Sequence, residues 1–318
     1  MPAILSRVSV IFLVSLALLA RVAHAQDAEF DSPYWGLLTF PVRAAKDLPD
    51  FFHAVDPRSH WQGEAVVTAL SLGLWYYDQK LLDESQRFAR HVRLISSHDD
   101  GKQTEQVAKP IIFGIGAPLN IPKTPNTILY YFGDGLTSFL IAGGLSSYSY
   151  FADETRGIKA ATQILESITL AGAFVLPLKM ATGRESPFRS SEERGQWRGF
   201  VGFKNYLGDV SKHDAYPSGH IATLTATVRV LAENYLEKSW ILPVGYTAMG
   251  LLMFAMLNNG EHWASDYPLG IAIGYTAAGV VVAHEKSPGL PGAAEITQGV
   301  SLVRDDEGGI GIRKSWVF

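Results

Sequence analysis

Apolar residues in this chain come in runs of helical length separated by polar turns. The first amphipathic pattern covers residues 63–78, and longer apolar runs cover 127–151 and 155–180. After a loop-like stretch at 181–217, three further runs cover 220–238, 240–257 and 267–284. The runs are rich in Ala, Leu and Gly and carry few strand signals. The pattern predicts an all-α helical bundle.

The two ends of the chain differ from this framework. Arg7, the apolar run "VSVIFLVSLALLA" and the small residues of "AHA" at 23–25 are typical of a secretory signal peptide over residues 1–25. An uncleaved anchor is the alternative, although the run is shorter than the roughly 20 residues that a membrane span needs. Residues 26–60 are predicted to form an irregular N-terminal arm and 61–285 the helical domain. In the tail, 286–318, weak alternation around "DDEGG" predicts a short β-hairpin.

Several apolar runs are long enough for either of two environments. The stretch "WILPVGYTAMGLLMFAML" at 240–257 could be a membrane span or a central helix that is apolar on all sides. Pro243, Thr247 and the glycines interrupt it, and its flanks carry little positive charge. These features favour buried helices in an exported, periplasmic domain, with membrane association as the open alternative.

Composition narrows the function classes. The formal net charge is -4 and the pI is about 6.1, so nothing indicates a nucleic-acid partner, which would favour a strongly basic face. The chain has no cysteine, so packing and not disulfide bonds must stabilise the exported protein.

Three polar segments stand at the ends of apolar helices in the second half of the chain. They are "KMATGRESP" at 179–187, "PSGH" at 217–220 and "GEHWASDYPLG" at 260–270. Antiparallel helices could bring these ends to one face. The first segment offers Lys179 and Arg184, which alone would be read as a basic helix end and a solvated loop.

The second segment has the features of an anion site. The first backbone N–H groups of a helix have no internal partner and attract negative charge. Gly219 would let an anion approach the backbone, Ser218 adds a hydroxyl, and His220 can exchange a proton near neutral pH. The ordinary alternative is that Ser218 caps the helix and His220 lies at the surface.

The third segment places His262 and Asp266 four residues apart. Pro268 suits the first turn of a helix, so Asp266 is expected at that helix's N-terminus. Its carboxylate could accept a hydrogen bond from a ring N–H of His262 and leave the other ring nitrogen as a nucleophile. The same segment would also be explained by an ordinary capping aspartate beside a partly buried histidine.

The order of these segments resembles the type-2 phosphatidic acid phosphatase and vanadium haloperoxidase superfamily. Its motifs are Lys-x6-Arg-Pro, Pro-Ser-Gly-His and Ser-Arg-x5-His-x3-Asp, and the resemblance covers residues 60–285. It implies a helical bundle of that family's type. It also implies that His262 attacks phosphorus and forms a phosphohistidine, that Asp266 orients His262, and that His220 protonates the leaving oxygen.

The resemblance further implies how the phosphate is held. Lys179, Ser218 and the amide of Gly219 would bind the phosphoryl oxygens. The phosphatases of the family use no metal or other cofactor, whereas the haloperoxidases hold vanadate in the same pocket. The implied partner is a phosphorylated small molecule or lipid.

The chain departs from the family pattern at two arginines. Ser186 stands where the first motif has Arg, and Ala255 and Met256 stand where the third has Ser-Arg. Phosphoryl transfer depends on positive charge around the transition state, and losing one placed donor costs roughly 100- to 1000-fold in rate. Arg184, two residues from the first vacant position, is the leading substitute. Three further arginines of the same loop are weaker candidates: Arg189, Arg194 and Arg198.

Three functions follow from these residues. The leading one is an exported phosphatase that hydrolyses a phosphate monoester or diphosphate, lipid-linked in preference, through a phosphohistidine. The second is a catalytically degenerate relative that binds phosphate or anionic lipid. The third is a vanadate-dependent haloperoxidase.

Overall fold

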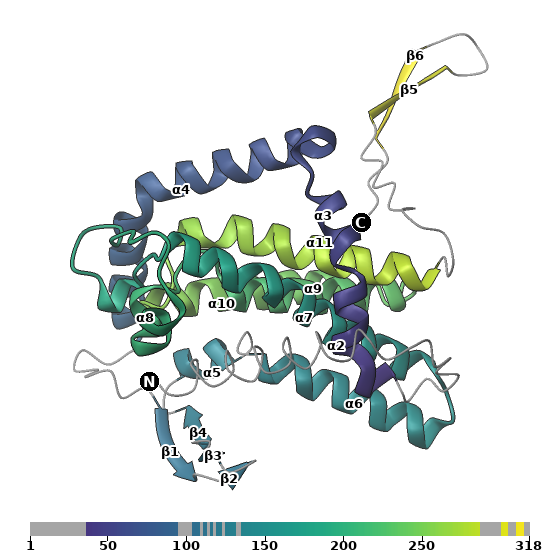
Figure 1. The fold of residues 1–318 in the computed structure, drawn as a ribbon, viewed down its shortest axis with the longest axis horizontal. Coiled ribbons are helices and arrows are strands. Elements are labelled where there is room, and N and C mark those ends of the chain that lie inside the picture. The colour runs from purple at the N-terminus through teal and green to yellow at the C-terminus, as the bar shows by residue number, and fades with distance from the viewer. Residues whose placement is uncertain are drawn as a thin grey trace.

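The computed structural model describes residues 36–94, 104–108, 111–112, 115–116, 119–122, 125–131, 135–286, 300–304 and 310–314. The all-α prediction is confirmed: apolar helices dominate this part of the chain (Figure 1). The helices are α2 (Gly36–Lys46), α3 (Leu48–Ala54), α4 (Pro57–His91), α5 (Pro125–Tyr131), α6 (Leu136–Ala152), α7 (Arg156–Thr182), α8 (Phe203–Gly208), α9 (Gly219–Asn234), α10 (Ile241–Asn259) and α11 (Tyr267–Lys286). The 3-10 turns within these ranges are η2 (Pro187–Arg189), η3 (Val210–Lys212) and η4 (Ala264–Asp266).

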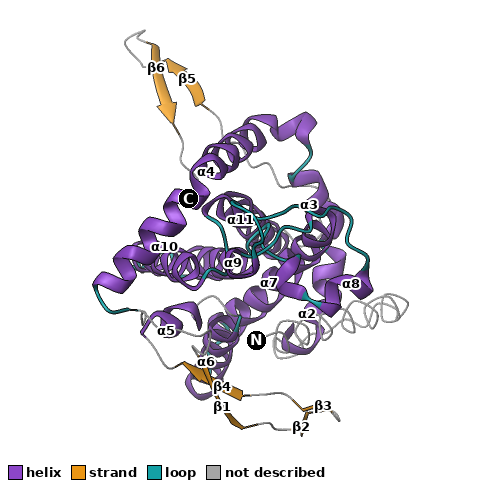
Figure 2. Ribbon diagram, turned by 90° about the vertical axis from the view of Figure 1, so that its left-hand side faces the viewer, coloured by secondary structure: helices purple, strands orange, loops and turns teal. Residues whose placement is uncertain are grey.

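Helix α9 occupies the middle of the bundle. It packs against α7, α10 and α11, and Figure 2, which looks along the bundle, shows α9 between these three helices. Its side chains Ile221, Ala226 and Val230 have no solvent exposure. Helices α2 and α6 pack on α7. The start of α9, where the motif "PSGH" lies, is therefore held by packing on three sides.

Glycine allows α11 to lie close against α9. A Cβ atom built on Gly274 would lie 2.1 Å from the carbonyl oxygen of Ala222, and one on Gly270 would lie 2.5 Å from that of Ser218. Both neighbours are backbone atoms, which cannot turn aside. The glycines thus fix the distance between α9, which carries His220 in its first turn, and α11, which follows His262.

The N-terminal arm differs from its prediction. Residues 26–60 were expected to be irregular, but from Gly36 onward the described part is helical. Prolines begin helices here as well as interrupting them: Pro49 and Pro57 lie in the first turns of α3 and α4, where a missing N–H costs little. Asp56 caps α4 by accepting a hydrogen bond from the Arg58 amide.

The described strands form two-stranded pairs. The tail strands β5 (Val300–Arg304) and β6 (Ile310–Lys314) pair antiparallel, as the sequence predicts. Unpredicted strands lie between α4 and α5: β1 (Thr104–Ala108) pairs with β4 (Leu119–Pro122), and β2 (Ile111–Ile112) with β3 (Ile115–Gly116). The predicted signal peptide at 1–25 lies outside the described residues.

Three helices of the described chain are long and apolar enough to cross a membrane. The segments are Arg156–Thr182, Ile241–Asn259 and Ala264–His284, with mean hydropathies of 1.5, 1.6 and 1.3. Their apolar windows are only 50%, 39% and 50% buried inside the protein. The sequence favoured fully enclosed helices, but the outward-facing apolar surface of α10, including Val244 and Leu251, agrees better with membrane association.

We expect Gly274→Ala to destabilise the fold by about 1–3 kcal/mol, because its methyl group would meet a backbone carbonyl. Gly250→Ala is the matched control: Gly250 lies inside α10 with nothing within 4 Å of an added Cβ. The control should stabilise the protein by up to about 1 kcal/mol through helix propensity. Thermal unfolding of the purified protein in detergent measures both. Equal melting temperatures for the two variants would contradict the close α9–α11 contact.

Candidate functional site

Three helix ends meet at one end of the bundle. Helix α7 ends there and is followed by Gly183 in the left-handed conformation (φ 58°), whose amide bonds the carbonyl of Lys179. Helix α9 begins there, and its cap Ser218 accepts a hydrogen bond from the Ile221 amide. Helix α10 also ends there, at Gly260 (φ 69°), just before His262. Local capping chemistry therefore sets where the side chains of all three segments begin to converge.

The two histidines lie against each other. The ring centroids of His220 and His262 are 5.7 Å apart, and the ring planes are inclined by 75°. Both side chains are buried, with 8% and 3% exposure. Segments that are 42 positions apart in sequence thus supply two imidazoles to one small volume.

A backbone carbonyl fixes the tautomer of His262. Its Nδ1 atom lies 2.7 Å from the carbonyl oxygen of Ala215. Because a carbonyl oxygen only accepts, Nδ1 carries the hydrogen, and in the neutral ring Nε2 keeps its lone pair. The nearest oxygen of Asp266 lies farther away, 3.4 Å from the same Nδ1. The N–H expected to point at Asp266 therefore bonds Ala215, with the carboxylate as a longer-range partner.

Burial holds His262 in its neutral form. It lowers the pKa of His262 well below the ordinary value, and the nearby charges of Lys179 and His220 act in the same direction. Asp214 and the bond to Ala215 oppose this shift. The ring is consequently unprotonated, and able to act as a nucleophile, at pH values where a solvent-exposed histidine would be charged.

Tyr130 is a partner of His220 that sequence reasoning missed. Its hydroxyl lies 3.1 Å from Nε2 of His220, and the two ring centroids are 4.9 Å apart. Tyr130 comes from the short helix α5 and is itself 6% exposed. In the sequence it belongs to an apolar run, "TILYYF", and nothing there marks it as part of a site.

Lys179 borders the first amide of α9. A Cβ atom on Gly219 would lie 3.9 Å from Nζ of Lys179, and the ammonium pairs with Asp214 at 3.6 Å. Ser218 is fully buried in its capping position. The ammonium and the partial positive charge of a helix N-terminus thus face the same space, which favours a bound anion.

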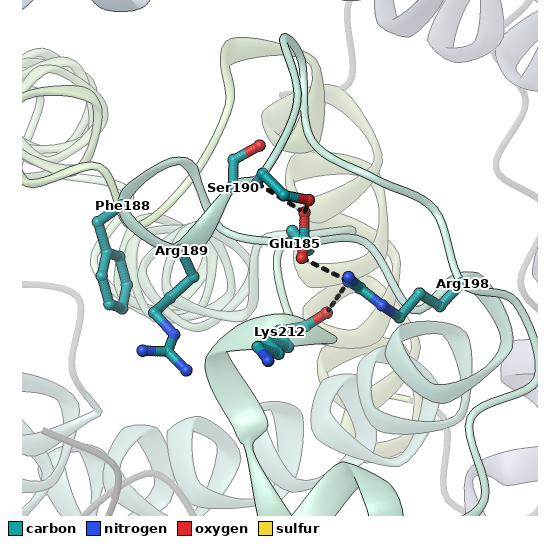
Figure 3. Close-up of a pocket in the computed structure, with 7 residues that line it drawn as sticks. Glu185, Phe188, Arg189, Ser190, Arg198 and Lys212 are labelled. Carbon is teal, nitrogen blue, oxygen red and sulfur yellow. Dashed lines mark hydrogen bonds and ion pairs between the residues drawn. The ribbon is translucent and has the colours of Figure 1, made fainter.

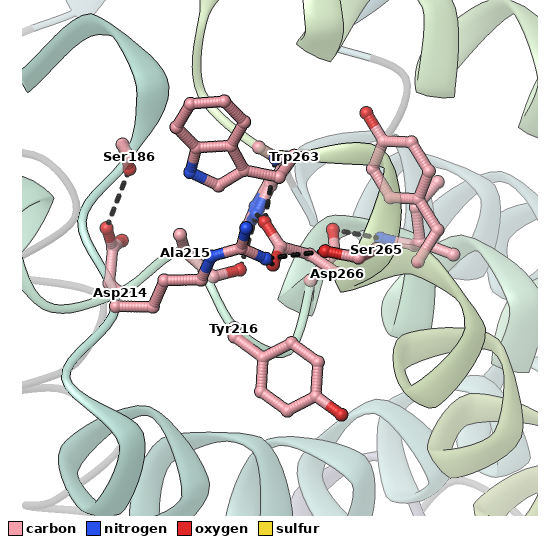
Figure 4. A network of polar contacts seen from close by, with 12 residues as sticks. Ser186, Asp214, Ala215, Tyr216, Trp263, Ser265 and Asp266 are labelled. Atoms are coloured by element: carbon pink, nitrogen blue, oxygen red, sulfur yellow. Dashed lines mark hydrogen bonds and ion pairs between the residues drawn. The ribbon is translucent and has the colours of Figure 1, made fainter. Parts of the chain in front are cut away.

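Arg184 lies deeper than the sequence predicts. It is completely buried between the rings of Trp197 and Trp263, whose centroids are 4.7 Å and 5.3 Å from its Cζ. Its five N–H groups are all used, by Arg194 O twice and by Ser265, Asp266 and Asp78 once each (the Asp266 end is labelled in Figure 4). No N–H group is left to bind a phosphate, so its geometry is that of a positioning residue for Asp266.

Asp78 completes this buried charge network. It is fully buried on α4, accepts from Nη2 of Arg184 at 2.7 Å, and also accepts from the amide and hydroxyl of Ser265 at 2.9 and 2.5 Å. On the other side of the guanidinium, Asp266 accepts from Nη1 at 2.6 Å. The side chains of Asp78 and Asp266 thus hold one arginine between them and connect α4 to the start of α11.

The other arginines of the loop have partners elsewhere. Arg189 pairs with Asp209, and Arg198 pairs with Glu185 at 2.6 Å. The guanidinium of Arg194 lies over the ring of Trp75, 5.0 Å from its centroid. Within the described ranges, no group of three or more His, Asp or Glu side chains is arranged to hold a metal ion.

The comparisons with known proteins place this region in a family. The sequence model of the PAP2 superfamily matches residues 160–286, the segment that contains all three motifs. Residues 160–286 belong to the PAP2 superfamily. A lipid A 1-phosphatase of Porphyromonas gingivalis is 34% identical over 77 residues, 24% of this chain and 17% of that protein's length. The chain therefore aligns with only a small part of this relative. No solved structure matches the chain.

The PAP2 positions at which this chain lacks arginine are filled by packed side chains. Ser186 is buried and donates to Asp214 at 3.3 Å. Ala255 and Met256 are fully buried, and Met256 belongs to the apolar cluster around Ile221. These positions are therefore occupied by buried side chains that leave no place for a guanidinium group.

We expect Arg184→Met to destabilise the protein by about 3–5 kcal/mol, because it leaves two buried carboxylates without their cation. Arg58→Met is the matched control, since Arg58 forms a solvent-screened surface pair with Asp56 whose loss should leave stability nearly unchanged. Denaturant unfolding in detergent measures both variants. A loss at Arg184 no larger than that at Arg58 would show that the network does not hold this end of the fold.

Proposed function

We propose that this protein is a membrane-associated phosphatase that hydrolyses a lipid-linked phosphate monoester or diphosphate through a phosphohistidine on His262. The single observation that carries the proposal is the packing of His220 against His262, with the Nδ1–H of His262 bound to Ala215. This arrangement leaves the Nε2 lone pair of His262 beside a second imidazole that can deliver a proton.

The chemistry needs two steps at these rings. In the first, Nε2 of His262 attacks phosphorus; the N–P bond forms, the P–O bond to the leaving group breaks, and protonated His220 gives its proton to the leaving oxygen. In the second, His220 takes a proton from water, the water oxygen attacks phosphorus, and the N–P bond breaks to release phosphate. Tyr130, at 3.1 Å, orients His220 in both steps.

Positive charge for the phosphate comes from two sources in this proposal. The ammonium of Lys179 and the amide of Gly219 face the same space, and a helix N-terminus favours an anion. Ser218 holds the helix start in place through its cap. Asp266 acts on His262 from 3.4 Å and is itself positioned by Arg184.

A lipid-linked substrate is supported by two findings. Three described helices have the length and hydropathy of membrane spans, and the curated relative is named as a phosphatase of lipid A. The three helix ends that carry the site include ends of these same apolar segments. Export through residues 1–25 stays a prediction.

A second candidate is a relative that binds phosphate or an anionic head group without turnover. The buried Ser186 and Met256 at the motif positions for arginine favour it, because each missing donor is expected to cost roughly 100- to 1000-fold in rate. Binding of vanadate or inorganic phosphate by a protein that releases no phosphate from any lipid phosphate would support this candidate over the phosphatase.

We expect His262→Ala to reduce phosphate release from phosphatidate by at least about 1000-fold, because the nucleophile is lost. His53→Ala is the control, since His53 is an exposed residue of α3. Phosphate release in detergent micelles is the measurement, with unfolding curves to verify that both variants are folded. Turnover that survives in His262→Ala would exclude the phosphohistidine mechanism.

The pH dependence should report the shifted pKa of His262. The nucleophile must be neutral, and burial with Lys179 nearby lowers its pKa, so the acidic limb of kcat/KM should fall below pH 6.5, the ordinary histidine value. Replacing Lys179 by Met removes one cause of the lowering and should move this limb to higher pH, as well as weakening phosphate binding. An acidic limb that stays fixed in Lys179→Met would contradict the proximity of the ammonium to the nucleophile.

A further inference from the structure

Two neighbouring cavities lie in the loop that joins α7 to α9. One has a volume of about 420 Å³ and the other about 670 Å³, and they share the side chains of Arg198 and Lys212. Figure 3 shows the smaller cavity, with Arg198 and Lys212 on one side and Phe188 and Arg189 on the other. Neither histidine of the site lines either cavity, so these spaces are separate from the proposed catalytic centre.

The cavity walls carry more positive than negative charge. Four cationic side chains line them, against two acidic ones, Glu185 and Asp209. The cations are Arg189, Arg198, Lys204 and Lys212. Glu185 is 1% exposed and accepts hydrogen bonds from the amides of Ser191 and Gln196 as well as pairing with Arg198. The negative charge of Glu185 is therefore used in hydrogen bonds and an ion pair that stabilise the loop.

Two of the cations remain available for a ligand. Lys204 is exposed and forms no ion pair within the described part of the chain. Among the described residues, Lys212 has only a long ion pair, with Asp209 at 3.7 Å. Ammonium groups on flexible stems, facing a cavity of this size, can close on an anion without breaking any buried contact.

His213 provides an independent sign of a missing partner. It lines the larger cavity and is only 8% exposed. Its buried Nδ1 atom has no hydrogen-bond partner among the described residues. Buried polar atoms are ordinarily satisfied, and one left alone costs free energy. Because the Nδ1 atom is closed to solvent, a ligand in the cavity could bond it only after the imidazole ring turns.

The chain connects these cavities directly to the catalytic histidines. Lys212 and His213 face the cavities, the next residue Asp214 pairs with Lys179, and Ala215 accepts the hydrogen bond from His262. Successive Cα atoms are about 3.8 Å apart, and three such steps lead from Lys212 in the cavity wall to Ala215, whose carbonyl accepts from His262. The Cα atoms of Lys212 and Ala215 are therefore at most about 11 Å apart, a separation that a lipid head group with two phosphates can span.

One exposed aromatic side chain borders the larger cavity, and a second lies next to Lys204 in sequence. Phe200 is 91% exposed in the loop before α8, and Phe203, the first residue of α8, is 46% exposed. Phe200 lines the cavity itself. Cations inside and aromatic rings at the rim suit a ligand with an anionic head and an acyl chain.

We propose that these cavities bind a second anionic group of the same lipid whose phosphate is cleaved, so that the preferred substrate is a lipid carrying two phosphates. This inference rests on the proposed function and specifies its substrate class. Lys204 and Lys212 are the specificity-determining residues.

The test compares two soluble lipids with the same chains. Dioctanoyl phosphatidate has one phosphate, and dioctanoyl phosphatidylinositol 4-phosphate has a monoester and a second phosphate. We expect the double variant Lys204→Gln/Lys212→Gln to lower the ratio of kcat/KM for the second lipid over the first by about five- to tenfold, since each lost contact of an exposed charge costs roughly three- to fivefold at most. The double variant Lys46→Gln/Lys238→Gln, at exposed lysines remote from the cavities, should leave the ratio unchanged.

A binding measurement separates this inference from the proposed function. In the His262→Ala background, calorimetric titration of phosphatidylinositol 4-phosphate should show a Kd that the Lys204→Gln/Lys212→Gln change weakens by about five- to tenfold. If the parent protein hydrolyses neither lipid, the phosphatase proposal fails, and the titration still decides whether the anion site exists.

Two results would overturn the proposal. One is an equal ratio of kcat/KM and an equal Kd in the parent and the double lysine variant. The other is a loss on both lipids that is seen only in vesicles containing anionic lipid and is absent in neutral detergent. That result would assign the cations to head groups of the surrounding bilayer and not to the substrate.

Discussion

The site depends on one buried guanidinium. Arg184 is enclosed between two tryptophan rings and two carboxylates that have no solvent exposure, Asp78 and Asp266. Charges removed from water are tolerated only where geometry and hydrogen bonds compensate the lost hydration, and here all five N–H groups are bonded. The backbone of Arg184 contributes too, because its carbonyl accepts from the amide of Ala215, whose own carbonyl holds His262. One residue thus positions the carboxylate and the backbone on either side of His262.

The same network explains why α4 belongs to the site. Asp78 lies outside the segment that matches the PAP2 superfamily, yet it is the only carboxylate among the described residues that bonds Nη2 of Arg184. An arginine near the first motif therefore requires an anion from another helix, and α4 supplies it. The cost is electrostatic: a guanidinium neutralised by two carboxylates adds little positive charge for a phosphate. The positive charge facing a phosphate must then come from Lys179 and the start of α9, with Asp214 reducing part of it.

The sequence predicts the parts of this structure that depend on local chemistry. Helix periodicity gives α7, α10 and α11 to within a few residues, and the Ser218 cap gives the start of α9. The convergence of the His220 and His262 segments follows from antiparallel helices whose ends share one face. Contacts between residues that are far apart in the sequence have no local sequence pattern that would predict them. Tyr130 is one aromatic in an apolar run and Asp78 one carboxylate on an amphipathic helix, so neither reads as a partner of the site. Its closeness in sequence to the vacant motif position predicts that Arg184 binds the phosphate. That closeness says nothing about which carboxylates neutralise the side chain in the folded protein.

The arrangement also constrains how a lipid can reach the histidines. Both rings are buried at the end of the bundle where α7 and α10 finish and α11 begins, and each of these helices is apolar over a length that could cross a membrane. At that end an apolar helix surface gives way to a loop rich in cations and exposed aromatics, among them Trp197 and Phe200, and a phosphate bound there would lie at this boundary. Such a boundary matches the boundary between acyl chains and head group within one lipid. A water-soluble ester would gain nothing from the exposed apolar helix surface beside the site. The lipid therefore fits the proposed phosphatase better than a small polar ester does, because it is the substrate whose two halves correspond to the two surfaces that meet at His262.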